Sequence, residues 1–419
     1  MIKLIEKIEG EAKLNFSFQE GRIDDVQVDF MSSRGIEEIL KGKSPLDALV
    51  INPRVCGICG HAHLIATVQA LESCYEDIKI SKKAKIIREL TLNFEIIQNH
   101  FKWFYLTIFP LFGLKQEIMK ALHPSQLMGK AIALFGGQYP HTSYAIVGGV
   151  ACEITNMDII KLQRYIDETI GFFEKNVANA DIQTLQKLEN TADIMTKQGD
   201  LPDILRTIEK NGWQKLGKSY DRFIAFGENS CFAKGKLLNA RIYRNVFVED
   251  VRESDSTTSF AKSVHYLDRY YEVGPLARAM IKKNPLIKDA HGRYEDSMFT
   301  RILARVYEIA GLLTHSRSLI EELDLSEPSY IKPDIDISQL NSSGSSAVEA
   351  ARGTLIHKVE IENSVIKNYE IITPTQWNLC GGDNKNRGVS QKAMIGLNNT
   401  DIAELVFKTF DVCSVCTTH

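Results

Sequence analysis

The sequence predicts a mainly α-helical fold of the α+β class, in which a core bundle of long helices carries small β hairpins and sheets at its periphery. Long segments with apolar residues at helical spacing fill residues 60–135 and 156–188. Strand-like alternation is confined to short stretches near both ends and around residues 221–250. No internal repeat, low-complexity tract or linker divides the 419 residues, so we expect a single domain over residues 1–419.

The N-terminal segment predicts a β hairpin. Apolar residues alternate on one face over residues 12–18, and a turn at 20–22 leads into a second alternating strand over 23–30. Residues 36–50 predict a helix followed by a short turn helix. The dipeptide Asn52-Pro53 then interrupts the chain.

Three long helices are expected next, at residues 60–76, 81–109 and 115–135. The second of them would be roughly 43 Å long at the usual helical rise per residue. A glycine-rich loop covers residues 136–150. Another long helix runs from about residue 156 to residue 188.

The rest of the chain is mixed before it returns to helix. A β section is expected near residues 221–250 and a long helix over 294–325. The proline and serine residues within 326–345 predict a loop there. Strands at about 354–372 then lead to a last helix near 399–409.

Composition indicates a globular protein with a large core. Hydrophobic residues make up 44% and charged residues 25%, and the net charge of −3 favours neither nucleic acid nor an anionic membrane as a partner. The most apolar stretch, residues 101–114, is shorter than the ~20 residues that span a bilayer. The N-terminus lacks the pattern of a signal peptide. We therefore expect a cytoplasmic protein without a membrane span of its own, and export together with a partner subunit stays open.

Four of the eight cysteines form two Cys-x-x-Cys pairs, Cys56 with Cys59 and Cys413 with Cys416. Each pair places two sulfurs close enough to bind one soft metal ion, so the two pairs together make a four-thiolate site. Zinc-ribbon pairs usually lie ~15–20 residues apart, whereas almost the whole chain separates these two. Spacing alone leaves structural zinc and a redox-active metal equally open.

The residues around these pairs resemble the large, catalytic subunit of nickel–iron hydrogenases. The runs Arg-x-Cys-Gly-x-Cys-x-x-x-His at 54–63 and Asp-x-Cys-x-x-Cys-x-x-His at 411–419 carry the resemblance. Residues 156–340 are similar only in helical character. The resemblance implies a nickel–iron hydrogenase large-subunit-like fold and reversible heterolytic cleavage of dihydrogen. The other similar blocks are residues 7–10, 34–37, 99–100, 139–149, 351–353 and 373–378.

The resemblance also implies the ligands of a nickel–iron centre. The second cysteine of each pair, Cys59 and Cys416, bridges from nickel to an iron that carries carbon monoxide and cyanide. Pro374 and Thr375 match the residues that contact these diatomic ligands, and a threonine hydroxyl can donate to a cyanide nitrogen. The implied nickel ligands are Cys56, Cys59, Cys413 and Cys416.

Four further residues are implied to act beside the metals. Glu9 occupies a proton-gate position, although an exposed glutamate at a strand end is the ordinary alternative. Arg352 matches an arginine over the open metal position, and Asp411 is its expected partner because a buried arginine is costly unless paired. His63, one helical turn after Cys59, is implied to donate to a bridging sulfur, whereas a lone histidine is more often an ordinary core or surface residue.

A second metal site is implied near the C-terminus. Glu37, His419 and the backbone carbonyl of Ile371 match the family's magnesium-like site. Oxygen ligands suit a hard cation, and the histidine leaves the identity of the ion open.

Dihydrogen cleavage releases two electrons, and the chain shows no group to accept them. The other four cysteines are scattered without the spacing of an iron–sulfur cluster, and no dinucleotide-binding fingerprint follows a strand. The sequence therefore predicts an obligate iron–sulfur small subunit, and further electron-transfer subunits are compatible with it. We expect this partner near the loop at residues 56–59, on apolar residues of the hairpin, the 36–60 segment and the 136–149 loop.

Three other functions are alternatives to an enzyme with sustained turnover. A dihydrogen sensor would have the same site, a signalling partner and little turnover. A metal-free scaffold like the related respiratory quinone-reductase subunit would lack the two cysteine pairs. A zinc-stabilised structural protein would leave Glu9, Arg352 and the Pro374-Thr375 block unexplained.

Overall fold

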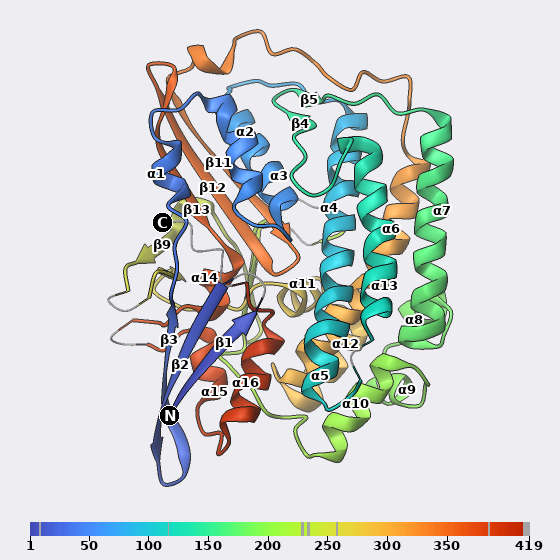
Figure 1. The fold of residues 1–419 in the computed structure, drawn as a ribbon, viewed down its shortest axis with the longest axis vertical. Helices are drawn as coiled ribbons and strands as arrows, with labels where there is room; N and C mark the ends of the chain where they lie inside the picture. Colours follow the sequence, from blue (N-terminus) through green and yellow to red (C-terminus); the bar gives the residue numbers. More distant parts are fainter. Residues whose placement is uncertain are drawn as a thin grey trace.

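The computed structural model describes residues 1–7, 10–115, 117–227, 230–232, 235–256, 259–383 and 386–413. Long helices lie side by side on one side of the molecule, and small antiparallel sheets lie on the other side with the N-terminus (Figure 1). The predicted mainly helical α+β class is therefore confirmed.

Four helices form the core bundle. The helix α4 (Lys82–Lys102) packs against α6 (Ile118–Gly136) and α13 (Met298–Glu321), and α7 (Asn156–Phe172) contacts both α6 and α13 (Figure 1). The apolar stripe predicted for the second long helix is buried, because one face of α4 meets its neighbours along its whole length. The buried members of this stripe are Ile86, Leu90, Phe94, Ile97 and Phe101 on α4, and Phe104 in the π-helical turn that follows it.

The helix predicted over residues 156–188 is interrupted, so its continuity was wrong. After a wider π-helical turn at the end of α7, Asn179 adopts a left-handed backbone with φ of 44°, which stops the helix. Asp181 then starts α8 (Ile182–Gln186) by accepting hydrogen bonds from two backbone N–H groups of its first turn. A similar π-helical turn at residues 103–108 separates α4 from α5 (Phe109–Leu111).

The N-terminal hairpin is confirmed as part of a larger sheet. The strands β2 (Gly10–Gln19) and β3 (Arg22–Phe30) pair antiparallel as predicted, and β1 (Ile2–Lys7), which the sequence analysis missed, pairs with the other edge of β2. The sheet packs on α15 (Val389–Met394), and α16 (Thr400–Thr409) belongs to the same apolar cluster. Elements from the N-terminal and C-terminal parts of the sequence therefore pack against each other in one apolar cluster.

A second sheet corrects another prediction. The strands β11 (Ser342–Ala350), β12 (Gly353–Glu362) and β13 (Val365–Ile372) form an antiparallel sheet, so the loop predicted over 326–345 ends earlier than expected. A Cβ atom on Gly344 would lie 2.2 Å from the backbone oxygen of Ala70 in α3 (Gly60–Glu72). The glycine and serine residues therefore reflect close packing of β11 on α3 and not a loop.

Shorter elements complete the fold. None of the helices in the described part of the chain is long and apolar enough to cross a membrane. The predicted β section near residues 221–250 is present as β6–β8. The remaining elements are α1 (Ile36–Leu40), α2 (Ala48–Ile51), β4 (Ala145–Ile146), β5 (Gly149–Val150), α9 (Thr191–Met195), α10 (Asp200–Lys210), β6 (Arg222–Ala225), β7 (Lys236–Asn239), β8 (Ile242–Asn245), β9 (Val251–Ser254), β10 (Ser263–Tyr266), α11 (Pro275–Ile281), α12 (Pro285–Tyr294) and α14 (Pro374–Leu379).

Candidate metal centre

Three cysteine sulfurs from the two ends of the sequence converge inside the molecule. The Sγ atoms of Cys56, Cys59 and Cys413 all lie within 4.8 Å of one another, and those of Cys56 and Cys413 are 3.8 Å apart. All three residues are buried. Thiolates at ~2.3 Å from one tetrahedral metal ion would lie about 3.8 Å apart, so these sulfurs fit a soft metal ion. The fourth predicted ligand, Cys416, lies outside the described residues.

The first cysteine pair is shaped by the turn that starts α3. The backbone N–H of Ile58 donates to the sulfur of Cys56 at 3.4 Å, and Cys59 is the N-cap of the helix. A Cβ atom on Gly60 would lie 2.2 Å from the backbone oxygen of Pro53, so only glycine allows this close approach. The Cys-Gly-x-Cys-Gly sequence therefore folds into a tight turn with both sulfurs on one side.

Two arginines share one buried carboxylate beside the sulfurs. Arg352, on the turn between β11 and β12, donates from Nε to the backbone oxygen of Asp411 and from Nη2 to its carboxylate, both at 3.1 Å. The other carboxylate oxygen of Asp411 accepts from Nη1 of Arg305 on α13 at 2.8 Å. The predicted pairing of Arg352 with Asp411 is confirmed. Arg305 was missed, although a cation within the apolar run of α13 was a usable signal.

The charges around the sulfurs stabilise anionic thiolates. Burial opposes the charged form of Arg352, but Asp411 and the thiolates of the three cysteines raise its pKa well above the ordinary value. Burial lowers the pKa of Arg305 to about 10, although Asp411 opposes this change. Both guanidiniums remain charged at neutral pH. The two arginines and one carboxylate thus leave a positive charge next to the thiolates.

A small cavity lies next to Cys59. It is lined by side chains from α3, the β11–β12 turn and the start of α14, including His63, Arg352, Pro374 and Thr375. Within the described part of the chain, Nη1 of Arg352 and Oγ1 of Thr375 are buried without a hydrogen-bond partner. Buried donors normally have partners, so this cavity fits small ligands that accept hydrogen bonds. The structure places Pro374 and Thr375 beside Cys59 in this cavity.

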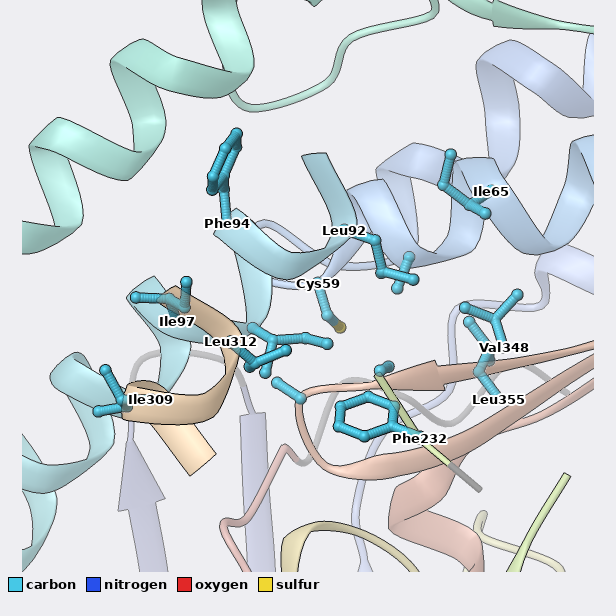
Figure 2. Close-up of a cluster of buried hydrophobic side chains, with 14 of the residues drawn as sticks. Cys59, Ile65, Leu92, Phe94, Ile97, Phe232, Ile309, Leu312, Val348 and Leu355 are labelled. Carbon is cyan, nitrogen blue, oxygen red and sulfur yellow. The ribbon is translucent and has the colours of Figure 1, made fainter. Parts of the chain in front are cut away.

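The surroundings of Cys59 are otherwise apolar. Figure 2 shows its side chain within a cluster of buried hydrophobic residues that includes Leu92, Leu312 and Phe232. These side chains come from α4, α13 and the segment before β7. They exclude water from one side of the thiolate site.

His63 lies in the same region and lines the small cavity. Its ring is buried on α3, and its Nδ1 atom is 3.1 Å from Nε2 of His357 on β12. Burial lowers the pKa of His63 to about 4, although the charge of Cys413 opposes this shift. The ring is therefore neutral and carries a single N–H.

A buried carboxylate that the sequence analysis missed supports the start of α3. Glu95 on α4 accepts hydrogen bonds at 2.9 Å from the backbone N–H groups of both His61 and Ala62. Burial raises its pKa to about 7, and the two backbone donors oppose this shift. A glutamate among the apolar residues of α4 was the signal in the sequence that could have indicated this buried carboxylate.

Two of the three groups predicted for a second metal site lie together. The backbone N–H of Ile371 on β13 donates to Oε1 of Glu37 on α1 at 2.7 Å, and both residues are buried. The third group, His419, lies outside the described residues, as does the predicted proton gate Glu9.

The chain is similar to a family model and to several known proteins. The family model described as nickel-dependent hydrogenase matches residues 34–108 and 238–419. The chain is 25% identical to the periplasmic [NiFeSe] hydrogenase large subunit of Desulfomicrobium baculatum, over 99% of this chain and 93% of that protein. It is 24% identical to the sulfhydrogenase 1 subunit alpha of Pyrococcus furiosus, over 99% and 96% respectively.

A solved structure shares the fold. The reduced Ni-Fe-Se hydrogenase from D. vulgaris Hildenborough superimposes with a TM-score of 0.83 at 23% identity, and the match covers 100% of both chains. At this identity the structural likeness bears on the fold alone.

Proposed function

The chain belongs to the nickel-dependent hydrogenase family, and from this premise we propose which residues hold and serve its metal centre. The protein is an oxidoreductase that cleaves dihydrogen reversibly at a nickel–iron centre. We assign nickel to Cys56, Cys59, Cys413 and Cys416, with Cys59 and Cys416 shared with iron. The convergence of three buried sulfurs from opposite ends of the sequence is the observation that carries this assignment.

When bound, the centre supplies the redox-active, Lewis-acidic metal pair at which dihydrogen is split into protons and electrons. The chain contributes the surroundings of that chemistry. The positive charge of Arg352 favours the anionic form of the three nearby sulfurs, and the apolar cluster beside Cys59 excludes water. Both effects strengthen electrostatic interactions at the reacting atoms.

The small cavity supports carbon monoxide and cyanide as iron ligands. In this proposal the hydroxyl of Thr375 would donate to a cyanide nitrogen, Pro374 would contact the diatomic ligands, and Arg352 would face the metal centre from the same cavity. The hydroxyl and the Nη1 group without a partner among the described residues are the donors that such a site requires.

Proton transfer is assigned to Glu9 and a ligand thiolate. A carboxylate within hydrogen-bond distance of a sulfur can accept its proton and pass it toward solvent. This role rests on the motif at residues 7–10, because Glu9 lies outside the described residues. His63 is assigned as a donor to a ligand sulfur, which fits its neutral ring.

A magnesium ion is proposed at the second site, with Glu37, the carbonyl of Ile371 and His419 as its protein ligands. The adjacency of Glu37 and Ile371 supports this proposal. The carboxylate and carbonyl oxygens are ligands that a hard cation prefers.

An iron–sulfur small subunit is proposed as the electron-accepting partner. The hairpin, the residue that follows it and the 36–60 segment expose large apolar side chains, which supports docking there. The 136–149 loop does not support it, because its large apolar side chains are buried or half-buried in this chain. The exposed apolar residues are Phe18, Met31, Ile39, Leu46 and Val50.

Dihydrogen-dependent reduction of an artificial electron acceptor tests the function. We expect turnover by the purified complex, together with exchange of deuterium from heavy water into dihydrogen. Exchange without sustained turnover would indicate the sensor instead, and the absence of both would contradict the proposal. A cytoplasmic location and a single domain over 1–419 remain predictions, which cell fractionation and limited proteolysis test, and one relative named above is periplasmic.

A further inference from the structure

A buried chain of hydrogen bonds leads away from His63. Nδ1 of His63 lies 3.1 Å from Nε2 of His357, and Nδ1 of His357 lies 2.8 Å from the hydroxyl of Tyr369. The three residues belong to α3, β12 and β13, and each is at most 1% exposed. These hydrogen bonds therefore connect α3, which has Cys59 at its N-cap, to the sheet that contains β12 and β13.

Only two arrangements of hydrogens are consistent with these distances. Two facing ring nitrogens 3.1 Å apart share a single hydrogen, and both rings are buried, so each ring carries one N–H. In the first arrangement Tyr369 donates to His357, His357 donates through Nε2 to His63, and both rings are Nε2–H tautomers. In the second arrangement every bond is reversed, and both rings are Nδ1–H tautomers.

The surroundings of Tyr369 favour the first arrangement. The Thr67 hydroxyl donates to the backbone oxygen of His63 at 2.7 Å and accepts from Nδ2 of Asn52 at 2.8 Å. The oxygen of Thr67 is 3.4 Å from the tyrosine hydroxyl, whereas Nδ1 of His357 is 2.8 Å from it. The 2.8 Å contact forms in either arrangement, but a phenol O–H is a stronger donor than a neutral imidazole N–H, and the 3.4 Å contact to Thr67 is a weak alternative, so the tyrosine proton belongs on the contact with His357.

The other end of the chain favours the same arrangement. His63 lines the small cavity together with Cys59, and the charge of Cys413 acts on its ring. A thiolate is stabilised by a donor and repelled by a lone pair. With Nδ1 occupied by His357, an Nε2–H is the group that His63 can offer to a sulfur.

We propose that His357 and Tyr369 are positioning residues that hold His63 in the Nε2–H tautomer, so that its ring donates to a ligand thiolate of the metal centre. The inference rests on the proposed thiolate centre and adds the residues that orient its histidine. Tyr369 and Asn52 are themselves buried, and no member of this chain among the described residues is exposed. The chain therefore orients His63 and is not a route for protons to solvent.

Nitrogen-15 NMR of histidine-labelled protein in a diamagnetic state tests the tautomers directly. Ring signals are assigned from His63→Gln and His357→Gln. The expected result is a protonated Nε2 and an unprotonated Nδ1 in both residues of the wild-type complex. Protonated Nδ1 atoms in these rings would overturn the proposal, whatever the metal content.

Infrared spectra of the metal-bound carbon monoxide test the consequence. In Tyr369→Phe, His357 loses its donor, so the donation to sulfur weakens and more electron density reaches the iron. The carbonyl band should move to lower frequency and kcat should fall, at unchanged nickel content. The matched control is Tyr144→Phe, another buried tyrosine, which bonds to Thr91 at 2.6 Å; its band should stay in place.

A double variant separates orientation of His63 from a general packing effect. His63→Gln should shift the band by itself, and adding Tyr369→Phe should shift it no further. An unshifted band in Tyr369→Phe, or a second shift in the double variant, would overturn the proposal. Where Tyr369→Phe does not fold, His357→Leu provides the same test. Wild-type protein without any such band would contradict the proposed function, and the NMR result would still decide the tautomer.

Discussion

The carboxylate shared by two arginines offers the sharpest single perturbation of the site. Asp411→Asn keeps the size of the side chain and removes its charge. Asp411 has a left-handed backbone with φ of 64°, which asparagine also tolerates, so backbone strain does not add to the effect. The change therefore isolates the charge between Arg305 and Arg352.

The expected loss follows from the geometry. Contacts of 2.8 and 3.1 Å correspond to a Coulomb attraction of about 5–6 kcal/mol each at an effective dielectric constant of about 20. Most of this attraction offsets the cost of burying the charges, and breaking a buried pair typically costs about 3–5 kcal/mol. We expect the free energy of unfolding to fall by that amount. Nickel content and turnover should fall too, because Arg352 loses its anchor.

Denaturant unfolding of the purified complex, with nickel analysis of the same samples, measures these effects. The matched control is Glu72→Gln, which breaks the buried pair of Glu72 with Arg88 (2.7 and 2.8 Å) at the other end of α3. It should cost comparable stability and leave nickel content and kcat near wild type. A loss below about 1 kcal/mol in Asp411→Asn, as for a surface pair, would refute the reasoning.

Three further predictions concern a metal ligand, a proton carrier and a buried carboxylate. Cys413→Ser should abolish nickel binding, because a serine hydroxyl is a poor ligand for a soft metal at neutral pH; full nickel occupancy would disprove the thiolate assignment. Glu9→Gln should leave metal content intact and greatly slow dihydrogen oxidation, since an amide cannot relay a proton; a wild-type rate would exclude Glu9 as the main route. Burial raises the pKa of Glu95 from 4.5 to about 7, so the folded state holds this proton more tightly than the unfolded state, and the free energy of unfolding should fall as the pH rises through this range. Glu95→Gln should flatten that fall, and equal slopes in the two proteins would contradict it.

The parts of the fold with regular periodicity could be predicted from the sequence. The apolar stripe of α4 and the alternation of β2 and β3 each bury one face, so the pattern identifies the element. The strand β11 could not be found this way. Its serine and glycine residues are required by the close approach of Gly344 to α3, and that contact depends on residues far away in the sequence.

The site was predictable where residues act in contiguous motifs. Cys56, Cys59 and Cys413, and Arg352 with Asp411, lie in short runs that resemble those of a known family, and this resemblance carries the information. Arg305 and His357 do not belong to such a motif. Each lies in the middle of a helix or strand and reaches the site only through tertiary packing. A single charged or polar residue within an otherwise buried element was the only local signal.

The central claim is that the converging cysteines hold nickel and an iron with diatomic ligands. Elemental analysis and infrared spectroscopy of one purified sample of the complex test it most directly. The account predicts nickel and iron in stoichiometric amounts, with bands from metal-bound carbon monoxide and cyanide that Cys413→Ser removes. Zinc in place of nickel, or a nickel-loaded protein without these bands, would contradict it.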